Sequence, residues 1–147
     1  MQIKITQKPF HISANARVLY KLIELLLILY FSRGKKASLL KIHLLIWVLE
    51  RRERREVLLK SKESGYEKSI GLWSSNEYTN KALLYLFEDG LCSINKKTYA
   101  LTDDGKEFIE QIIKDKEVFI EEKSFLKTVT MSLTEAKIEK LKKIWMI

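Results

Sequence analysis

The side chains with the most evident chemistry in this sequence are basic, and they form three short groups. The groups are Arg33, Lys35 and Lys36; Arg51, Arg52, Arg54 and Arg55; and Lys96 and Lys97. Cations clustered in this way bind phosphate oxygens of nucleic acids without reading bases. We therefore treat these residues as candidate contacts to a nucleic-acid backbone. The run ERRERRE is also typical of a solvated helix face, so that second interpretation stays open.

The positive charge is concentrated in the first half of the chain. Residues 1–75 hold 15 Lys and Arg against 6 Asp and Glu, a net +9, whereas residues 76–147 hold 12 against 13, a net −1. A one-sided basic surface favours an anionic partner, either nucleic acid or an acidic protein surface. An ordinary solvated surface is the alternative.

Residue patterns that support catalysis are missing from the sequence. It contains no GxxxxGK[ST], GxGxxG, HExxH or paired CxxC, and its two histidines are too few for most zinc sites. His43 lies in an apolar stretch, where a structural role is expected, and Cys92 is expected to pack as a small hydrophobic residue. Glu24 lies among leucines, so it needs a partner or a shifted pKa, and Lys21 is close enough in sequence to contact it. We expect no enzymatic activity, no cofactor and no metal.

The composition points to the cytoplasm. A single cysteine excludes an internal disulfide, and residues 1–10 contain no apolar signal-peptide core. The most apolar stretch, residues 22–31, has about half the length of a membrane span and includes Glu24. We expect a cytoplasmic protein without a membrane segment.

The 147 residues suit one domain, and with one Pro and five Gly the chain should be mainly helical. We expect an N-terminal arm over residues 1–14 with a short strand at 2–6. A first helix should follow from Ser13 or Asn15 to Phe31, apolar on all sides, and therefore central to the core or covered by a partner. A second helix should begin near Ala37 and could run on to residue 60. Residues 61–75 read as irregular, with a short extended piece at 68–73.

The second half reads as a third helix, a β-hairpin and further helices. The third helix should start at Asn76 and stop before Gly90, which is suited to a positive φ. Residues 91–94 and 98–101 form two β-type runs around a polar turn, and Thr102 is placed to cap the next helix. Residues 116–147 form a C-terminal helical extension, whose first part either continues that helix or starts a new one.

The stretch NKALLYLFEDGLCSINKKTYALTDDGKEFIEQI, which contains the pattern Y-x-L-T-x-x-G at residues 99–105, resembles a winged helix-turn-helix. This resemblance implies a mainly α fold in which residues 91–101 form the wing. Over residues 12–143 the chain is also similar to the middle components of three-component ABC-ATPase systems, including the Lamassu type of anti-phage defence. That similarity implies a small non-catalytic subunit bound to an SMC/Rad50-like ATPase and to a separate effector.

The expected third helix is a poor DNA reader. Of its first residues Asn76 and Asn80 suit adenine, but Lys81 is the only cation, and sequence-specific readers usually carry more Arg and Lys. Apolar surface is more abundant than a small domain easily buries, and the C-terminal tail adds to it. We therefore take as candidate partner contacts the tail residues Ile138, Leu141, Ile144 and Trp145.

Two functional hypotheses follow. The first is a protein-interaction subunit that bridges the ATPase and the effector and contributes, at most, contacts to DNA backbone. The second is a DNA-binding winged-helix transcriptional regulator, which rests on the fold and on the basic first half. We favour the first.

Overall fold

The computed structural model describes the backbone of residues 12–67 and 77–146 and the side chains of residues 18–67 and 77–142. The strand predicted at residues 2–6 and the extended piece predicted at 68–73 lie outside this part of the chain. The described part is mainly helical, with a small antiparallel sheet. None of its helices is long and apolar enough to cross a membrane.

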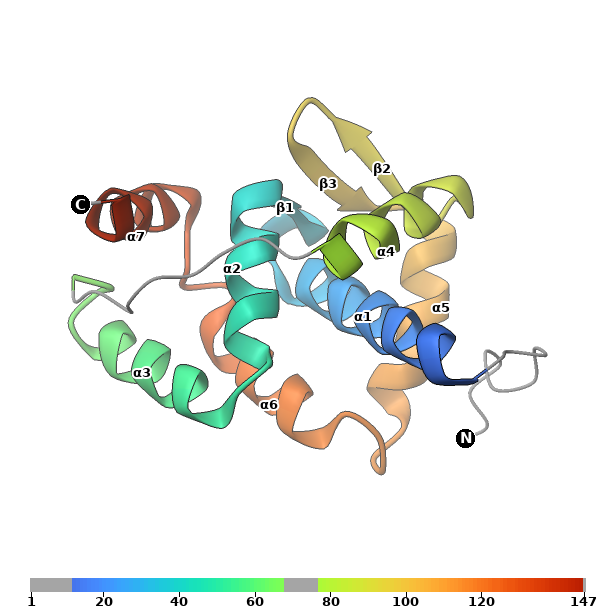
Figure 1. Cartoon of the computed structure of the whole chain (residues 1–147), viewed down its shortest axis with the longest axis horizontal. Helices are drawn as coiled ribbons and strands as arrows, with labels where there is room; N and C mark the ends of the chain where they lie inside the picture. The colour runs from blue at the N-terminus through green and yellow to red at the C-terminus, as the bar shows by residue number, and fades with distance from the viewer. Residues whose placement is uncertain (1–11, 68–76, 147) are drawn as a thin grey trace.

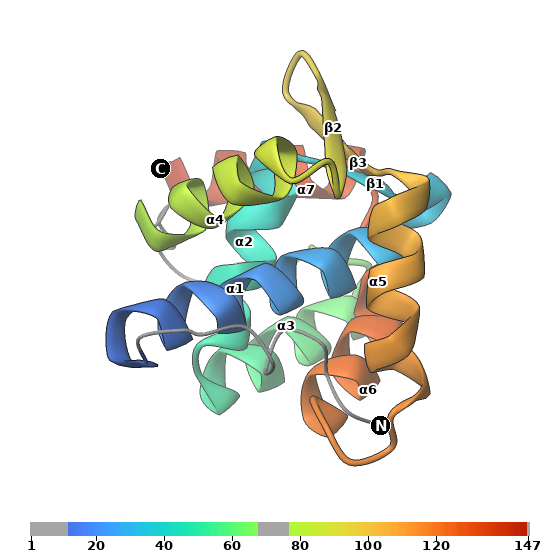
Figure 2. The same cartoon turned by 90° about the vertical axis from the view of Figure 1, so that its right-hand side faces the viewer.

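Helix α1 (Ile12–Phe31) forms the centre of the molecule. Its residues 25–29 are completely buried because their apolar side chains cover every side of the helix. It contacts α2 (Leu39–Leu49), α4 (Glu77–Glu88), α5 (Asp103–Lys114) and α6 (Ile120–Val129), which surround it in Figures 1 and 2. Of the two explanations for an all-round apolar helix, the structure supports the central position. Since α1 starts at Ile12, residues 12–14 belong to it and not to an N-terminal arm.

The predicted hairpin is confirmed, with its first strand shifted by one residue. Strands β2 (Cys92–Asn95) and β3 (Thr98–Leu101) pair antiparallel and project beyond the helices, as both views show (Figures 1 and 2). Gly90 has φ +74° and Lys96 has φ +60°, which is the left-handed conformation expected at a helix stop and in a tight turn.

A third strand, β1 (Lys36–Ser38), was not predicted. It pairs antiparallel with β3, with Ser38 opposite Thr98, and gives the strand order β1-β3-β2. The prediction of helix from Ala37 is wrong at this point: the Ser38 hydroxyl accepts a hydrogen bond from Lys41 N at 3.1 Å, and the helix begins only at Leu39. The 3-10 turn Arg33–Lys35 connects α1 to this strand.

The second helix does not continue to residue 60. It ends at Leu49, Arg51 is extended with φ −139° and ψ 137°, and a separate helix α3 (Arg52–Glu63) follows. Similarly, α5 ends at Lys114 and α6 is a new helix. The ammonium of Lys123 donates to the carbonyl of Ile112 at 2.9 Å and also to that of Asp115, and so satisfies free carbonyls at the end of α5.

The C-terminal extension shares the core of the rest of the chain. Helix α6 contacts α1 and α3, and α7 (Glu135–Met146) contacts α2. One continuous apolar cluster includes Leu45 of α2, Leu126 of α6 and Leu141 of α7. Residues 116–142 therefore complete the core instead of extending away from it.

Candidate interaction surfaces

Helix α4 divides into a buried and an exposed arc. The buried arc consists of Thr79, Ala82, Leu83 and Leu86. With 3.6 residues per turn, Leu84 lies close to the middle of the opposite arc, among the charged residues Glu77, Lys81 and Glu88. This arc is mixed, but it carries three large apolar side chains: Leu84 is 54%, Tyr85 47% and Phe87 47% exposed. A helix of this length usually buries residues of these types, so their exposure requires an explanation.

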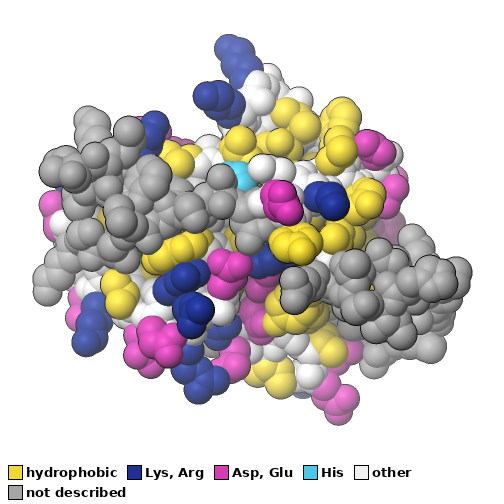
Figure 3. Space-filling model, in the orientation of Figure 1, with side chains coloured by type: hydrophobic (Ala, Val, Ile, Leu, Met, Phe, Trp, Pro, Cys, Tyr) yellow, Lys and Arg dark blue, Asp and Glu magenta, His cyan; other side chains and the backbone are white. Residues whose placement is uncertain are grey.

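The apolar surface of α4 continues onto the neighbouring strand. Ile94 of β2 is 41% exposed, and β2 contacts α4. We call Leu84, Tyr85, Phe87 and Ile94 the α4–β2 patch. Figure 3 shows hydrophobic side chains over α4 and the hairpin, with acidic and basic side chains beside them and basic side chains at the hairpin tip. The patch thus places apolar side chains on the exposed surface of α4, the helix that would read DNA in a winged helix-turn-helix.

The polar residues of α4 give little support to base reading. The side chain of Asn80 forms a hydrogen bond with His43 of α2. Burial lowers the pKa of the His43 imidazole, and this hydrogen bond partly opposes the effect. Lys81 is the one cation of α4, and Asn76 lies outside the described residues. The amide that suits adenine is thus engaged by a neighbouring side chain.

The nine candidate phosphate contacts do not form one surface. Lys36 belongs to β1, which pairs with β3, and the amide of Leu39 donates to the carbonyl of Lys97 at 2.8 Å. In this register Lys36 is opposite Ala100 and Ser38 is opposite Thr98, so residues 33–36 belong to the same small sheet as the wing but run away from Lys96 and Lys97 at its tip. Both segments lie on the side of the N-terminal end of α2. The run Arg51–Arg55 lies at the other end of this 11-residue helix, which is about 16 Å away. We call residues 33–36 with Lys96 and Lys97 the wing-side basic group.

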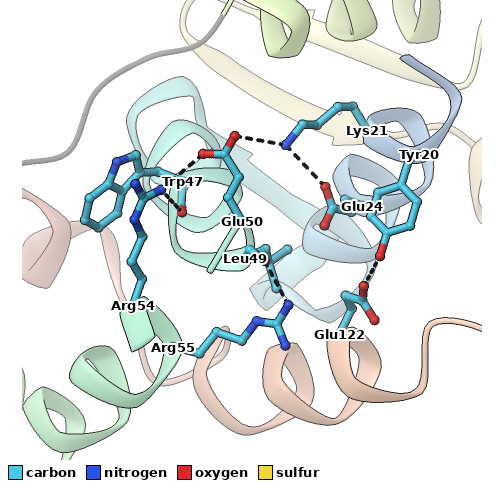
Figure 4. Close-up of polar contacts among 9 residues, drawn as sticks. All are labelled: Tyr20, Lys21, Glu24, Trp47, Leu49, Glu50, Arg54, Arg55 and Glu122. Carbon is cyan, nitrogen blue, oxygen red and sulfur yellow. Dashed lines mark hydrogen bonds and ion pairs between the residues drawn. The ribbon is translucent and has the colours of Figure 1, made fainter. Parts of the chain in front are cut away.

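Within the second group, two arginines are engaged in the fold. Arg54 donates to the carbonyl of Trp47 at 2.8 Å and to Glu50 at 3.2 Å, and its guanidinium lies 4.0 Å from the Trp47 ring centroid. Arg55 donates to the carbonyl of Leu49 at 2.9 Å. Both carbonyls belong to the last turn of α2, where that of Trp47 also accepts from the amide of Glu50 at 3.4 Å, so both arginines cap that helix (Figure 4). Arg54 and Arg55 are thus engaged within the fold, which weakens the case for them as phosphate contacts; that role stays a prediction.

The other two arginines of this run are exposed. Arg52 is 70% exposed and pairs with Glu121 at 2.9 Å, whereas Arg51 stands at the break between α2 and α3. An exposed ion pair of this kind contributes little to stability. For Arg51 and Arg52, both interpretations of the ERRERRE run therefore stay open: phosphate contact or solvated helix surface.

A partly buried polar network joins α1 to α6 and to the end of α2 (Figure 4). Lys21 lies 3.6 Å from both Glu24 and Glu50, and the Tyr20 hydroxyl donates to Glu122. Burial raises the pKa of Glu24 to about 7, an effect that Lys21 opposes and that the carboxylates of Glu122 and Glu50 reinforce. Lys21 is the partner that the sequence made possible, and Glu122 is a member that it did not suggest.

This network connects side chains of α1, α2 and α6. Burial and the carboxylate of Glu122 raise the pKa of Tyr20. Among the described residues, no group of three or more metal-ligating side chains converges here or elsewhere. We assign the network a structural role.

The predicted partner contacts in the C-terminal tail are only partly described. Ile138 and Leu141 are buried against the rest of the chain, so they are core residues and the prediction that they face a partner is wrong. The apolar stripe of α7 turns inward because α7 packs on α2. The side chains of Ile144 and Trp145 lie outside the described residues.

Comparison of the chain with protein-family models, curated proteins and solved structures finds no match. Geometry and chemistry must therefore carry the functional argument.

Proposed function

We propose that this protein is a non-catalytic winged-helix subunit that binds another protein through the α4–β2 patch. The observation that carries the proposal is the exposure of Leu84, Tyr85 and Phe87 on the outward arc of α4. Aromatic residues exposed together are typical of protein interfaces, where they contribute much of the binding energy. A DNA-reading helix would carry Arg, Lys, Asn or Gln at these positions.

The order of the elements supports the winged-helix assignment. Helices α1, α2 and α4 are followed by the β2–β3 hairpin, and β1 pairs with β3 to complete the small sheet. In this assignment α4 is the third helix of the motif and the hairpin is its wing. Helix α3 is then an insertion between the second and third helices.

The partner class comes from the sequence resemblance to middle components of three-component ABC-ATPase systems. A subunit of that kind contacts an SMC/Rad50-like ATPase and an effector, and it needs surface complementarity instead of an active site. The α4–β2 patch fits this requirement, and it replaces Ile138 and Leu141 as the proposed contact. In this role the protein takes part in anti-phage defence in the cytoplasm.

Co-purification with the ATPase subunit from the same genome tests the proposal. The test variant combines Leu84→Glu with Phe87→Glu, which places two charges in the patch. The matched control combines Val57→Glu with Leu59→Glu, because both residues are exposed apolar positions on α3. We expect the patch variant to lose the ATPase and the control to keep it, with both retaining native circular dichroism. Retention by the patch variant and loss by the control would place the interface on α3.

The wing-side basic group favours a second candidate function, contact with DNA. Arg33, Lys36, Lys96 and Lys97 are all exposed and belong to adjacent segments. Such a group binds backbone phosphates with little sequence preference. A DNA-binding regulator would instead show a strong preference for one operator, which a comparison of unrelated duplexes would reveal.

A further inference from the structure

A pocket of about 360 Å³ lies between β1, the start of α2 and the connection from α6 to α7. Its polar lining includes Arg33, Lys36, Lys41, Ser38, Thr134 and Glu135. Three of these residues are cationic and one is anionic, so the lining has a net charge of +2. The volume is within the range of small-molecule sites in proteins.

Lys41 is the most unusual member of this lining. It occurs in the apolar sequence of α2, and only 4% of its surface is exposed. Its ammonium donates to the carbonyl of Thr130 at 2.8 Å. An ammonium has three N–H donors, and in the described part of the chain no carboxylate forms an ion pair with it. Burial of an ammonium costs desolvation free energy, and the negative charge of Glu135, in the same pocket lining, offsets part of that cost.

The electrostatic surroundings of Lys41 belong to the same pocket. Burial lowers the pKa of Lys41, and the positive charge of Arg33 lowers it further, whereas the negative charge of Glu135 raises it. Glu135 also accepts a hydrogen bond from the amide of Ser38 at 3.3 Å. The carboxylate of Glu135 thus occupies part of the pocket, where the Ser38 amide and the cationic side chains favour a negatively charged group.

We propose that this pocket binds the phosphate group of a small phosphorylated ligand. Lys41 supplies the buried contact and Arg33 and Lys36 supply exposed contacts, while Thr98 and Thr134 add hydroxyls. Cations and hydroxyls are the groups that bind phosphate oxygens by short charge-assisted hydrogen bonds. Glu135 competes with the ligand for the Ser38 amide and would move aside on binding. The pocket exceeds the size of phosphate itself, which leaves room for the organic part of a phosphomonoester.

Isotope-edited NMR titrations of the full chain test this proposal. The probes are inorganic phosphate and adenosine 5′-monophosphate, with sodium chloride at the same ionic strength as the reference. We expect saturable shifts centred on the amides of Ser38, Leu39 and Glu135. Stronger binding of the nucleotide would identify a phosphomonoester, and equal binding would identify the phosphate group as the whole ligand.

Three variants give the expected pattern. Lys36→Gln should weaken binding about tenfold, the factor for losing one charge-assisted contact. Glu135→Gln should strengthen it, because the competing charge is removed. Lys41→Met replaces the ammonium by an unbranched apolar side chain that is one atom shorter, so the protein should stay folded and lose saturable binding. Lys106→Gln, at an exposed position on α5, is the charge-matched control and should bind like the native chain.

The proposal is overturned if Lys41→Met, shown to be folded by its NMR spectrum, binds both probes as the native chain does. It is also overturned if neither probe gives saturable shifts, or if Lys106→Gln weakens binding as much as Lys36→Gln.

Discussion

Gly105 of α5 lies against the backbone carbonyl of Leu91. A Cβ atom at position 105 would be 1.9 Å from the Leu91 oxygen and 2.9 Å from its carbonyl carbon. The Thr102 hydroxyl connects the two segments: Oγ1 accepts from the amide of Gly105 at 3.0 Å and donates to the carbonyl of Gly90 at 2.6 Å. The final glycine of the Y-x-L-T-x-x-G pattern thus allows the helix after the wing to approach the start of β2.

Replacing Gly105 with alanine should destabilise the protein by about 3 kcal/mol, because the clash is with backbone and the neighbouring segments must move. Urea unfolding followed by circular dichroism measures this as a lower midpoint at an unchanged slope. Lys106→Ala, one residue later and exposed, is the control and should change stability by less than about 0.5 kcal/mol. Equal stability of the two variants would mean that α5 can shift freely against Leu91.

Arg54→Gln should cost about 1–2 kcal/mol of stability, since it removes the cap on the carbonyl of Trp47 and the stacking on its ring. Arg52→Gln removes an equal charge from the same run, but its ion pair with Glu121 is exposed. That control should change stability by less than about 0.5 kcal/mol. A larger loss from Arg52→Gln in the same urea experiment would contradict the capping role of Arg54.

The stability of the protein should fall as pH rises through the range set by Glu24. The folded chain holds the Glu24 proton up to a pKa of about 7, whereas the ordinary value is 4.5. Because the folded state binds more protons between these values, the free energy of unfolding contributed by Glu24 decreases from pH 4.5 to pH 7 and is constant above. At 1.36 kcal/mol per pKa unit the full loss is about 3 kcal/mol.

Glu24→Gln should remove this loss, because glutamine stays neutral across the range. The variant should then be more stable than the native chain at pH 8, with a smaller difference at pH 5. The charged groups that face Glu24 are Lys21, Glu50 and Glu122. The matched control is Glu107→Gln, because Glu107 is exposed on α5 and lies outside this set. Parallel stability curves for Glu24→Gln and the native chain between pH 4.5 and 8 would show that Glu24 is ionised in the fold.

Any DNA binding should depend on the wing-side basic group. Changing Lys96 and Lys97 together to Gln should weaken binding equally on unrelated duplexes and reduce the slope of log K against log salt by about 2. The matched control changes Arg51 and Arg52 to Gln, which removes the same charge from the other end of α2. If the control changes the slope and the wing variant does not, the contact lies on the Arg51–Arg55 run.

The hairpin and the caps around it could be predicted from sequence because their determinants are local. Gly90 and the hydroxyl of Thr102 act on backbone only a few residues away, and both behave as predicted. The turn expected at residues 95–97 is one residue shorter, because Asn95 belongs to β2 and pairs with Thr98. The burial of α1 was also evident, since an all-round apolar helix needs cover on every side.

Local signals were not sufficient for β1 and for the end of α2. Strand β1 exists because residues 36–38 pair with residues 98–100, and three residues have no strand pattern of their own. The ERRERRE run has helical pairs at i,i+4, yet α2 ends at Leu49 and Arg51 is extended, and Arg54 and Arg55 donate to carbonyls of the last turn of α2.

The helical class, the hairpin and the basic first half of this protein follow from the amino-acid sequence. Which residues are accessible depends on how the elements pack, and this packing buries Ile138 and Leu141, exposes Leu84 and Phe87, and encloses Lys41 in a pocket with Glu135. Helix and turn formation depends on neighbours along the chain, whereas burial and charge pairing depend on which elements pack together, and such contacts join residues as distant as Lys41 and Thr130.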